Sequence, residues 1–313
     1  MSVYSQNELS KFGPNDAWIK LFELVPKGSD VLDIGCSSGN LGLALKQQKH
    51  VHVVGVDIDE GDLKEAKKHL DAVHLLNVES DDLSGLGKFD VVIMADVIEH
   101  LVNPVPALKK IKQLLKPKGR LVFSIPNMAN VTTRVELLKG RFEYKDFGLL
   151  DRTHLHFYDE AEVNRVFIES GLNVLKTDCT VRDIPEDILV KDLASVGIAL
   201  TPKLQQNLKE SKGLIYQFIG YAEPSAKPKS FTAKTSSDLD SVSKQMREMD
   251  EALAASNLQA KILSDKVKEL QKHADDVNAQ LQGVLQSRGW RALSKAHKIK
   301  HSITHIGRTK AKK

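Results

Sequence analysis

The chain has 313 residues, 41% of them hydrophobic and 27% charged, which is typical of one large globular domain with an appendage or of two domains. Its 19 Gly and 10 Pro argue against a collagen-like or low-complexity protein, and no apolar run approaches the roughly 18–20 residues of a membrane-spanning helix. The first sixteen residues lack the apolar core of a secretory signal, and Cys36 and Cys179 cannot form a disulfide framework, so we expect a cytoplasmic protein.

The net charge of +4 is unevenly distributed along the chain. The last 27 residues contain nine Lys and Arg and no Asp or Glu, so the other 286 residues carry 36 basic against 41 acidic groups, a net of −5. Neutralising a phosphate backbone needs a positive surface on the body of a protein. The acidic body therefore argues against specific nucleic-acid binding.

From about residue 15 to 126, short β-branched apolar runs alternate with helical segments. The predicted strands, whose length and Val/Ile content suit burial on both faces, are 31–35, 51–57, 73–77, 89–96 and 120–126. The predicted helices between them are 41–48, 60–70 and 104–115, the last closed by KPKG at 116–119. Such units form a parallel sheet with right-handed crossovers. The predicted fold class is α/β, a doubly wound, mostly parallel, Rossmann-like sheet that binds ligands at the carboxyl ends of its strands.

The pattern continues beyond Pro126 and then changes. Helices are predicted at 131–139, at 159–170 and near 185–210, and apolar runs at 173–181 and 214–222 would complete the sheet. The globular domain is therefore predicted to span 1–222. Residues 223–238 are rich in Pro, Ser, Thr and Lys and have no apolar period, which predicts a flexible linker.

An apolar repeat with 3,4 spacing runs through residues 239–286. Its first series is Leu239, Met246, Leu253, Ala260, Val267, Ala274 and Leu281, and its second is Val242, Met249, Ser256, Leu263, Leu270, Val277 and Val284. More than six heptads with Ser256 as the single polar member predict a C-terminal coiled coil and hence a homo-oligomer. The alternative is one long amphipathic helix packed on the globular domain.

Residues 287–313 form a basic tail with interleaved apolar side chains. In a helix, one face would carry Trp290, Leu293, Ile299, Ile303 and Ile306. Such a helix can lie on an anionic membrane surface, here the inner face of the membrane, or dock on an acidic partner. The alternative is a solvated tail with no specific contact.

The sharpest local signal is VLDIGCSSGN at 31–40, where a buried strand ends in Asp33 and enters a Gly-rich turn, Gly35 to Gly39. Dinucleotide sites more often show G-x-G-x-x-G without an acidic residue before the turn, because a carboxylate repels phosphate. Asp33 suits a ligand with an ammonium group. Asp57 ends the next strand about twenty residues on, where a carboxylate can accept two ribose hydroxyls. One ammonium and one ribose suggest S-adenosylmethionine.

Several segments together resemble a class I S-adenosylmethionine-dependent methyltransferase. They are DIGCSSGN, VGVDID, ADVIEHL at 95–101, KPKGRLVFSIPN at 116–127 and GRFEYKDFGLLDRTHLHFY at 140–158, and the resemblance covers about 14–180 and more loosely extends to 222. The last block is similar to the branch associated with bacterial surface-polysaccharide and glycan biosynthesis. The SRGWRAL segment after the heptads is similar to tails in such pathways. The resemblance thus implies a glycan or sugar-linked acceptor, and a glycan-assembly enzyme as a partner of the tail.

The resemblance also implies roles for individual residues. The loop residues Asp33, Gly35, Cys36 and Gly39 would hold the methionine part. The ribose and adenine would contact Asp57, Ile58 and Asn77, and Asp96 would lie beside the methionine moiety. Two positions depart from the family pattern: Ser37 replaces a frequent glycine, and Asn77 replaces the usual acid.

An alcohol acceptor needs a base because a neutral hydroxyl is a poor nucleophile, whereas a carboxylate or phosphate acceptor needs none. The candidate catalytic residues are His100, His154 and His156, and the candidate acceptor contacts are Glu99, Asp151 and Arg152. In an extended segment, His154, His156 and Arg152 share a face that could hold a phosphate or sugar acid. Alternatively these groups only anchor a loop.

The two cysteines and the metal ligands complete the sequence predictions. Cys36 is expected to be a small packed residue, since no base accompanies it, and Cys179 to be core. No Cys/His cluster has zinc spacing, so no metal is expected.

The sequence thus predicts an O-methyltransferase that uses S-adenosylmethionine on a glycan or sugar-linked acceptor. The alternatives are a non-catalytic scaffold with a vestigial methyltransferase domain, a small-molecule or protein methyltransferase, and an NAD-linked enzyme on the same type of sheet.

Overall fold

The computed structural model describes two stretches of the globular part, 15–182 and 184–233, and part of the C-terminal region. That part consists of the helix 263–276 and the single residues 259, 261, 279, 280, 282, 283, 286, 289, 291 and 292. The chain divides near residue 245 into two compact units, each of which is described by itself. No helix of these stretches is both long and apolar enough to cross a membrane.

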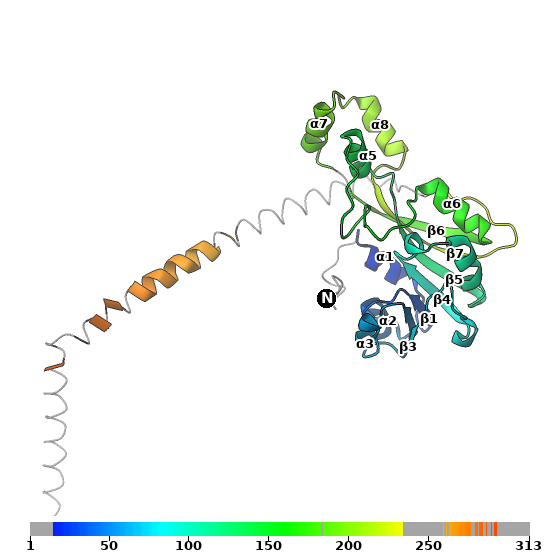
Figure 1. Cartoon of the computed structure of the whole chain (residues 1–313), viewed down its shortest axis with the longest axis horizontal. Coiled ribbons are helices and arrows are strands. Elements are labelled where there is room, and N and C mark those ends of the chain that lie inside the picture. Colours follow the sequence, from blue (N-terminus) through cyan, green and yellow to red (C-terminus); the bar gives the residue numbers. More distant parts are fainter. Residues whose placement is uncertain are drawn as a thin grey trace, which may run out of the picture. The chain divides into compact units, whose positions relative to one another are not determined.

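The first unit is built on one seven-stranded sheet with the order β3-β2-β1-β4-β5-β7-β6 (Figure 1). The strands are β1 Asp30–Ile34, β2 His52–Asp57, β3 Ala72–Leu75, β4 Phe89–Ala95, β5 Leu115–Pro126, β6 Leu172–Val181 and β7 Ile215–Pro224. Strands β1 to β5 pair in parallel, and β7 lies antiparallel between β5 and β6. The predicted doubly wound, mostly parallel α/β fold is confirmed.

The described part of the first unit contains eight helices. They are α1 Ala17–Leu24, α2 Asn40–Lys49, α3 Glu60–Ala66, α4 Pro104–Lys112, α5 Val131–Leu138, α6 Glu160–Glu169, α7 Glu186–Ser195 and α8 Pro202–Glu210, with short 3-10 turns η2 Ser84–Leu86 and η3 Ile98–His100. Asp16 and Asp59 cap α1 and α3 by accepting a backbone amide, as Ncap aspartates do. Helices α2 to α8 lie within or close to the predicted segments, although α3 ends at Ala66, and α1 had no predicted counterpart.

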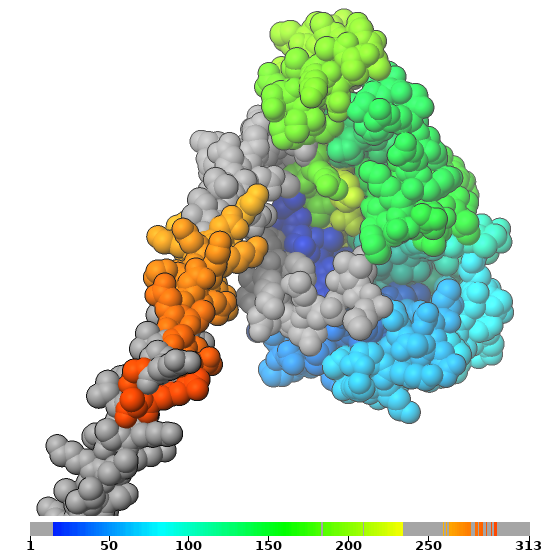
Figure 2. Space-filling view, turned by 60° about the vertical axis from the view of Figure 1, so that its left-hand side comes forward, coloured from blue at the N-terminus to red at the C-terminus, as the bar shows by residue number. Residues whose placement is uncertain are grey.

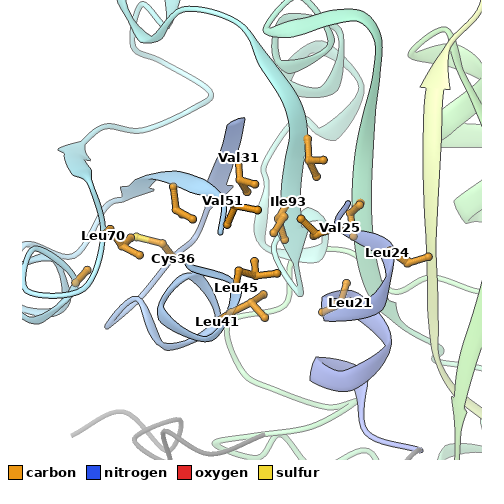
Figure 3. Close-up of a cluster of buried hydrophobic side chains, with 14 of the residues drawn as sticks. Leu21, Leu24, Val25, Val31, Cys36, Leu41, Leu45, Val51, Leu70 and Ile93 are labelled. Carbon is orange, nitrogen blue, oxygen red and sulfur yellow. The ribbon is translucent and has the colours of Figure 1, made fainter. Parts of the chain in front are cut away.

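Both faces of the sheet are covered by helices. On one face, Leu21 of α1 and Leu45 of α2 lie in one buried cluster with Ile93 of β4 (Figure 3). On the other face, the rings of Phe123 in β5 and Phe167 in α6 have centroids 4.5 Å apart. Since neighbouring strand residues point to opposite faces, a strand covered on both sides must be apolar at every position, as 121–123 are in β5.

A small helical subdomain stands beside this sheet. Helices α7 and α8, inserted between β6 and β7, pack with α5 around Val131, Val135, Leu189 and Leu193. Figures 1 and 2 both show these helices in green at the top, away from the blue β1 to β3. The subdomain therefore has a hydrophobic core of its own.

Strand β5 begins earlier than the sequence predicted. Leu115 already pairs with Phe89, and the ladder then shifts register so that Val91 pairs with Arg120. The KPKG segment at 116–119, predicted to end the preceding helix, is the irregular part of this strand, with Lys118 in the left-handed region at φ 67°. The Pro and Gly of KPKG signal a break that the structure accommodates inside a strand.

The described part of the predicted linker packs on the domain. The Asn164 side chain of α6 donates to the Phe231 carbonyl at 2.9 Å and accepts from the Phe231 amide at 2.7 Å. The Asn173 side-chain oxygen accepts from the Lys229 amide at 2.9 Å, and Ala233 is only 1% exposed. Residues 225–233, which we call the strap, therefore extend the folded domain beyond the predicted boundary at residue 222.

The second unit contains a helix over 263–276. Its apolar residues Leu263, Val267 and Leu270 are 58%, 56% and 62% exposed. The coiled-coil pairing itself stays a prediction, and most heptad positions and nearly all of the basic tail lie outside the described residues.

Candidate active site

A cavity of about 780 Å³ opens at the carboxyl ends of β1, β2 and β4. This is the edge at which doubly wound sheets bind ligands. Its walls come from the loop after β1, the ends of β2 and β4, and the segment 147–154. The cavity contains nearly all of the predicted site residues, as the following geometry shows.

The loop after β1 has a backbone that favours glycine. Gly35 has φ 72°, and a Cβ at this position would lie 2.6 Å from Cγ2 of Val97. Ser37 also has a positive φ, 45°, which explains physically why a glycine is frequent at this position in the resembling family. Gly39, at φ 79°, is the Ncap of α2.

Asp57 at the end of β2 holds this loop in place. Its two carboxylate oxygens accept the Ser37 amide at 2.8 Å and the Asp59 amide at 3.0 Å. The Ser37 hydroxyl donates to Asp62 at 2.6 Å. Asp57 therefore has a positioning role in addition to the ribose contact predicted from the sequence.

Asp33 is a buried carboxyl facing the cavity, with 3% exposure. Burial, and then the nearby Asp57, raise its pKa to about 7. Two carboxylates at the floor of a cavity favour a cationic ligand, because a nearby positive charge offsets both the desolvation and the mutual repulsion.

The far end of the cavity is apolar and open. Ile58 and Val102 line it and are 73% and 63% exposed. Asn77 also lines it, but its side-chain carbonyl already accepts the Glu79 amide at 2.9 Å. Glu79 in turn accepts the Val102 amide, at 3.0 Å, so this rim is tied together by hydrogen bonds.

Asp96 lies where β4 ends, with φ 52°. Its carboxylate accepts the Ser124 hydroxyl at 2.8 Å and the Gln217 amide at 2.9 Å. Burial raises its pKa, and these two hydrogen bonds oppose the rise. Asp96 therefore joins the ends of β4, β5 and β7 at the wall of the cavity.

Glu99 and His154 meet although they are far apart in the sequence. The backbone carbonyl of Glu99 accepts the amides of Leu155 at 2.9 Å and His156 at 3.1 Å. This pairing places Nε2 of His154 3.9 Å from Oε1 of Glu99. Burial, and then Asp96, raise the pKa of Glu99 well above its ordinary range. Burial and the neighbouring His100 lower the pKa of His154, so its imidazole is neutral near pH 7.

His156 and Arg152 do not share a face with His154. Nε2 of His156 bonds the Val102 carbonyl at 3.2 Å, and Arg152 is an exposed partner of Asp146 at 2.8 Å. Residues 152–157 form no strand, so the alternation that would align the three side chains is absent. Of these three predicted residues, only His154 lines the cavity.

The remaining predicted residues have clear places. Asp151 lines the cavity while its side chain accepts from the Thr153 amide at 2.8 Å. Cys36 lines the cavity and is buried, and burial raises the pKa of its thiol, so it is a packed thiol as expected. Cys179 is buried too.

The chain matches one family model, described as a methyltransferase domain, over residues 11–177. A ubiquinone biosynthesis O-methyltransferase of Coxiella burnetii is 34% identical over 161 residues, covering 49% of this chain and 67% of the relative. One from Thiobacillus denitrificans is 27% identical over 198 residues, covering 55% and 85%. The chain belongs to this methyltransferase family.

Solved methyltransferase structures are similar over two thirds of the chain. The magnesium protoporphyrin IX methyltransferase of Synechocystis PCC 6803 has a TM-score of 0.44, with 20% identity over 67% of this chain and 80% of that one. A methyltransferase from Thermotoga maritima has a TM-score of 0.46, with 18% identity over 66% and 88%.

S-adenosylmethionine is the cofactor of this methyltransferase, and the residues present fit it. The buried Asp33 carboxyl suits an ammonium group, the end of β2 offers Asp57 to ribose hydroxyls, and the exposed Ile58 and Val102 offer an apolar surface to adenine. The departure at Ser37 is compatible with this fit, since its positive φ of 45° lies in the region that favours glycine.

Several lining residues of the methyltransferase were not predicted from the sequence. They are Trp18, Glu79, Phe147, Tyr216 and Gln217. Tyr216 and Gln217 lie near the start of β7, which is last in the sequence but lies beside β5 in the sheet. For these residues, the sequence pattern that pointed to the site was Gln217, a polar residue within the apolar run 214–222. A polar residue that interrupts a buried-strand pattern is often a site residue.

Proposed function

We propose that the methyltransferase acts on a hydroxyl oxygen of a glycan or sugar-linked acceptor. One observation carries this proposal: the side chains of Glu99, His100 and His154 line the same cavity as the cofactor loop. A neutral hydroxyl is a poor nucleophile, and transfer to it requires groups that assist the departure of its proton. The two imidazoles provide such groups beside the cofactor site, and the Glu99 carboxyl lies next to that of His154.

Different residues of the cavity would bind the cofactor in one half and the acceptor in the other. When bound, S-adenosylmethionine supplies an electrophilic methyl group on its sulfonium. Asp33 and Asp57 hold and orient that half, so that much of the acceleration comes from positioning. Phe147 and Tyr216 offer aromatic faces on the other half, onto which the apolar face of a sugar ring can stack.

The relatives support methyl transfer to oxygen and favour a second acceptor class. Both reported relatives are named ubiquinone biosynthesis O-methyltransferases. The second candidate acceptor is therefore a hydroxyl on an intermediate of ubiquinone biosynthesis. Phe147, 65% exposed at the cavity, suits the apolar surface of an aromatic acceptor as well as it suits a sugar ring.

The decisive experiment combines cofactor binding with an acceptor screen. Calorimetry with S-adenosylhomocysteine, with NAD as the control, tests the cofactor half. Methyl transfer from labelled S-adenosylmethionine is then measured on free sugars, lipid-linked glycans and phenolic alcohols. We expect binding of S-adenosylhomocysteine alone, and labelled product from the sugar acceptors. Product from the phenols only would favour the second candidate.

The variant His154→Ala tests the hydroxyl-activating half. We expect it to bind S-adenosylhomocysteine as the unaltered chain does and to lose at least about 100-fold in turnover, the usual scale for acid–base assistance. His69→Ala, outside the cavity, is the matched control. Unchanged turnover in His154→Ala would contradict the proposed role of this cluster.

We propose further that two or more copies associate through residues 239–286. Leu263, Val267 and Leu270 follow the 3,4 spacing, and each is more than half exposed on the described helix. A second copy of the same helix offers a complementary apolar stripe.

We propose that the enzyme is cytoplasmic. Its basic tail, residues 287–313, would hold it either at the inner face of the membrane or against a glycan-assembly enzyme. The nine basic residues support this proposal, at about 1 kcal/mol each near anionic headgroups. Co-sedimentation with anionic vesicles tests it, with neutral vesicles as the control. Equal pelleting with both kinds of vesicle would argue against a charged membrane target.

A further inference from the structure

We infer that Glu99, His100 and His154 form a binding site for one divalent first-row transition metal ion such as Mn²⁺, Co²⁺ or Zn²⁺. The role given to the ion below rests on the proposed function, but the site itself does not. The three side chains each offer one ligand atom, and these atoms all lie within 4.8 Å of one another.

The two imidazoles are already fixed in the ligand tautomer. Nδ1 of His100 lies 3.1 Å from the Thr153 carbonyl, and Nδ1 of His154 lies 3.2 Å from the Leu149 carbonyl. A carbonyl oxygen can only accept, so Nδ1 is the donor in both contacts, and Nε2 is the ring atom left to bind an ion. A backbone carbonyl behind the imidazole is the usual second partner of a metal-bound histidine.

The Glu99 carboxyl is the observation that calls for a ligand. It is 0% exposed, and neither of its oxygens has a hydrogen-bond partner within the described residues. A buried carboxyl without a partner is costly whether it is ionised or protonated. Nε2 of His154, at 3.9 Å, is too far for a hydrogen bond but is well placed to share an ion with Oε1.

The backbone gives this cluster a rigid frame. Glu99 and His100 belong to η3. The two hydrogen bonds from backbone amides to the Glu99 carbonyl hold the segment that carries His154. Ligand atoms about 2.0–2.2 Å from a common ion lie roughly 3–3.5 Å apart. Side-chain rotations that move the ligand atoms by about 1 Å would therefore complete the site. Asp96, whose charge acts on Glu99, adds to the negative potential.

The ligand set decides the class of ion. Two imidazole nitrogens with one carboxylate suit Mn²⁺, Fe²⁺, Co²⁺ and Zn²⁺, whereas Mg²⁺ and Ca²⁺ prefer all-oxygen ligands. Three protein ligands leave coordination positions open, as in catalytic metal sites. All three residues line the cavity, so an acceptor hydroxyl can reach those positions.

Coordination would lower the pKa of the hydroxyl. As its proton leaves to water, the oxygen forms a bond to the methyl carbon. The bond from that carbon to sulfur breaks, and its electron pair stays on the sulfur, which becomes neutral. The ion gains and loses no electron, so no oxidant or reductant is required.

The test is a titration of the metal-free full chain with Mn²⁺, in which free Mn²⁺ is followed by electron paramagnetic resonance. We expect one site per chain in the unaltered protein, and binding weakened by more than about 100-fold in Glu99→Gln and in His154→Ala. His156→Ala is the matched control, because Nε2 of His156 bonds the Val102 carbonyl outside the cluster.

Folding does not confound this comparison. Glu99→Gln keeps the shape of the side chain and removes a buried acid, so we expect it to unfold no earlier than the unaltered chain. The chain has 11 histidines, which can bind metal elsewhere. Binding that survives both Glu99→Gln and His154→Ala would therefore overturn the site. Displacement of Mn²⁺ by equimolar Mg²⁺ would overturn the imidazole ligand set.

The metal site and the proposed function fail separately. No Mn²⁺, Co²⁺ or Zn²⁺ binding, together with methyl transfer that persists in a chelator, would overturn the metal site and leave the O-methyltransferase intact. Metal binding at these residues without methyl transfer to any hydroxyl would uphold the site and overturn the proposed function.

Discussion

At the scale of single residues, Asp33 carries the sharpest conflict between stability and binding. Burial and Asp57 raise its pKa from 3.8 to about 7 in the folded chain. The folded protein therefore holds a proton that the unfolded chain releases, and the free energy of unfolding falls as the pH rises from about 4 to 7. Above pH 7 the ionised carboxyl is the form that binds an ammonium group.

A pH series of thermal unfolding checks this coupling. From pH 5.5 to about 7 we expect the Tm of the free protein to fall and then to level off. Over the same range the increase in Tm caused by S-adenosylhomocysteine should grow, because the ligand requires the ionised carboxyl. Asp33→Asn should flatten the first trend and weaken ligand binding at least about tenfold, a loss of roughly 1.4 kcal/mol. A ligand-induced increase that shrinks toward pH 8.5 would contradict the assignment.

Gly35 and Gly28 separate backbone strain from steric exclusion. Both have φ near 70°, but a Cβ at Gly35 would lie 2.6 Å from Val97, whereas nothing lies within 4 Å of a Cβ at Gly28. We expect Gly28→Ala to cost about 1 kcal/mol and to leave cofactor affinity unchanged. Gly35→Ala should cost about 1–3 kcal/mol more and reduce the affinity sharply. Urea unfolding and calorimetry measure both effects, and equal affinities would exclude a close approach of cofactor at this loop.

At the scale of elements, a reciprocal pair of hydrogen bonds is one of the contacts that hold the strap 225–233 on the domain. Asn164 both donates to and accepts from the Phe231 backbone. Asn164→Ala should therefore cost about 1–3 kcal/mol and release the strap to proteases, because two backbone groups lose their partner. Limited proteolysis followed by mass spectrometry should show faster cleavage within 225–233. Asn207→Ala on the exposed face of α8 is the control, and equal cleavage rates would show that the strap is held by other contacts.

Most of the elements could be predicted from the sequence because each is a local pattern. The runs 31–35 and 51–57 are apolar at most positions, as strands covered on both faces must be. The start of β5 and the packing of the strap could not be predicted. In both, residues that normally break structure are held by partners far along the chain, such as Phe89 and Asn164.

The site divides in the same way. Asp33, the Gly-rich loop and Asp57 follow from the rule that ligands sit at the carboxyl ends of parallel strands. The meeting of Glu99 with His154 depends on two backbone hydrogen bonds that span more than fifty residues. No spacing rule describes such a pairing. His154 and His156 were therefore equal candidates on sequence grounds, although only His154 lines the cavity.

At the scale of the whole molecule, the exposed apolar stripe on residues 263–276 predicts the state of association. The double variant Val267→Asp and Leu270→Asp should reduce the mass measured by light scattering to that of a single chain, because two charges would be buried at the seam. Lys272→Asp lies on the opposite side of the heptad and serves as the control. S-adenosylhomocysteine binding should be equal in all three proteins. An unchanged mass in the double variant would contradict the coiled coil.

The Glu99 carbonyl accepts hydrogen bonds from the amides of Leu155 and His156. These long-range contacts also predict the order in which the site folds. The cofactor loop and Asp57 come from β1 to β4, which are close together in the sequence and close short loops, whereas the histidine of the opposite wall arrives more than fifty residues later and β7 later still. Contacts between distant segments form slowly because their loops are costly to close. A nascent or refolding chain should thus assemble the Asp33 and Asp57 side of the cavity first and the His154 side last. S-adenosylmethionine could then bind to the folding chain before the groups proposed to promote methyl transfer are in place.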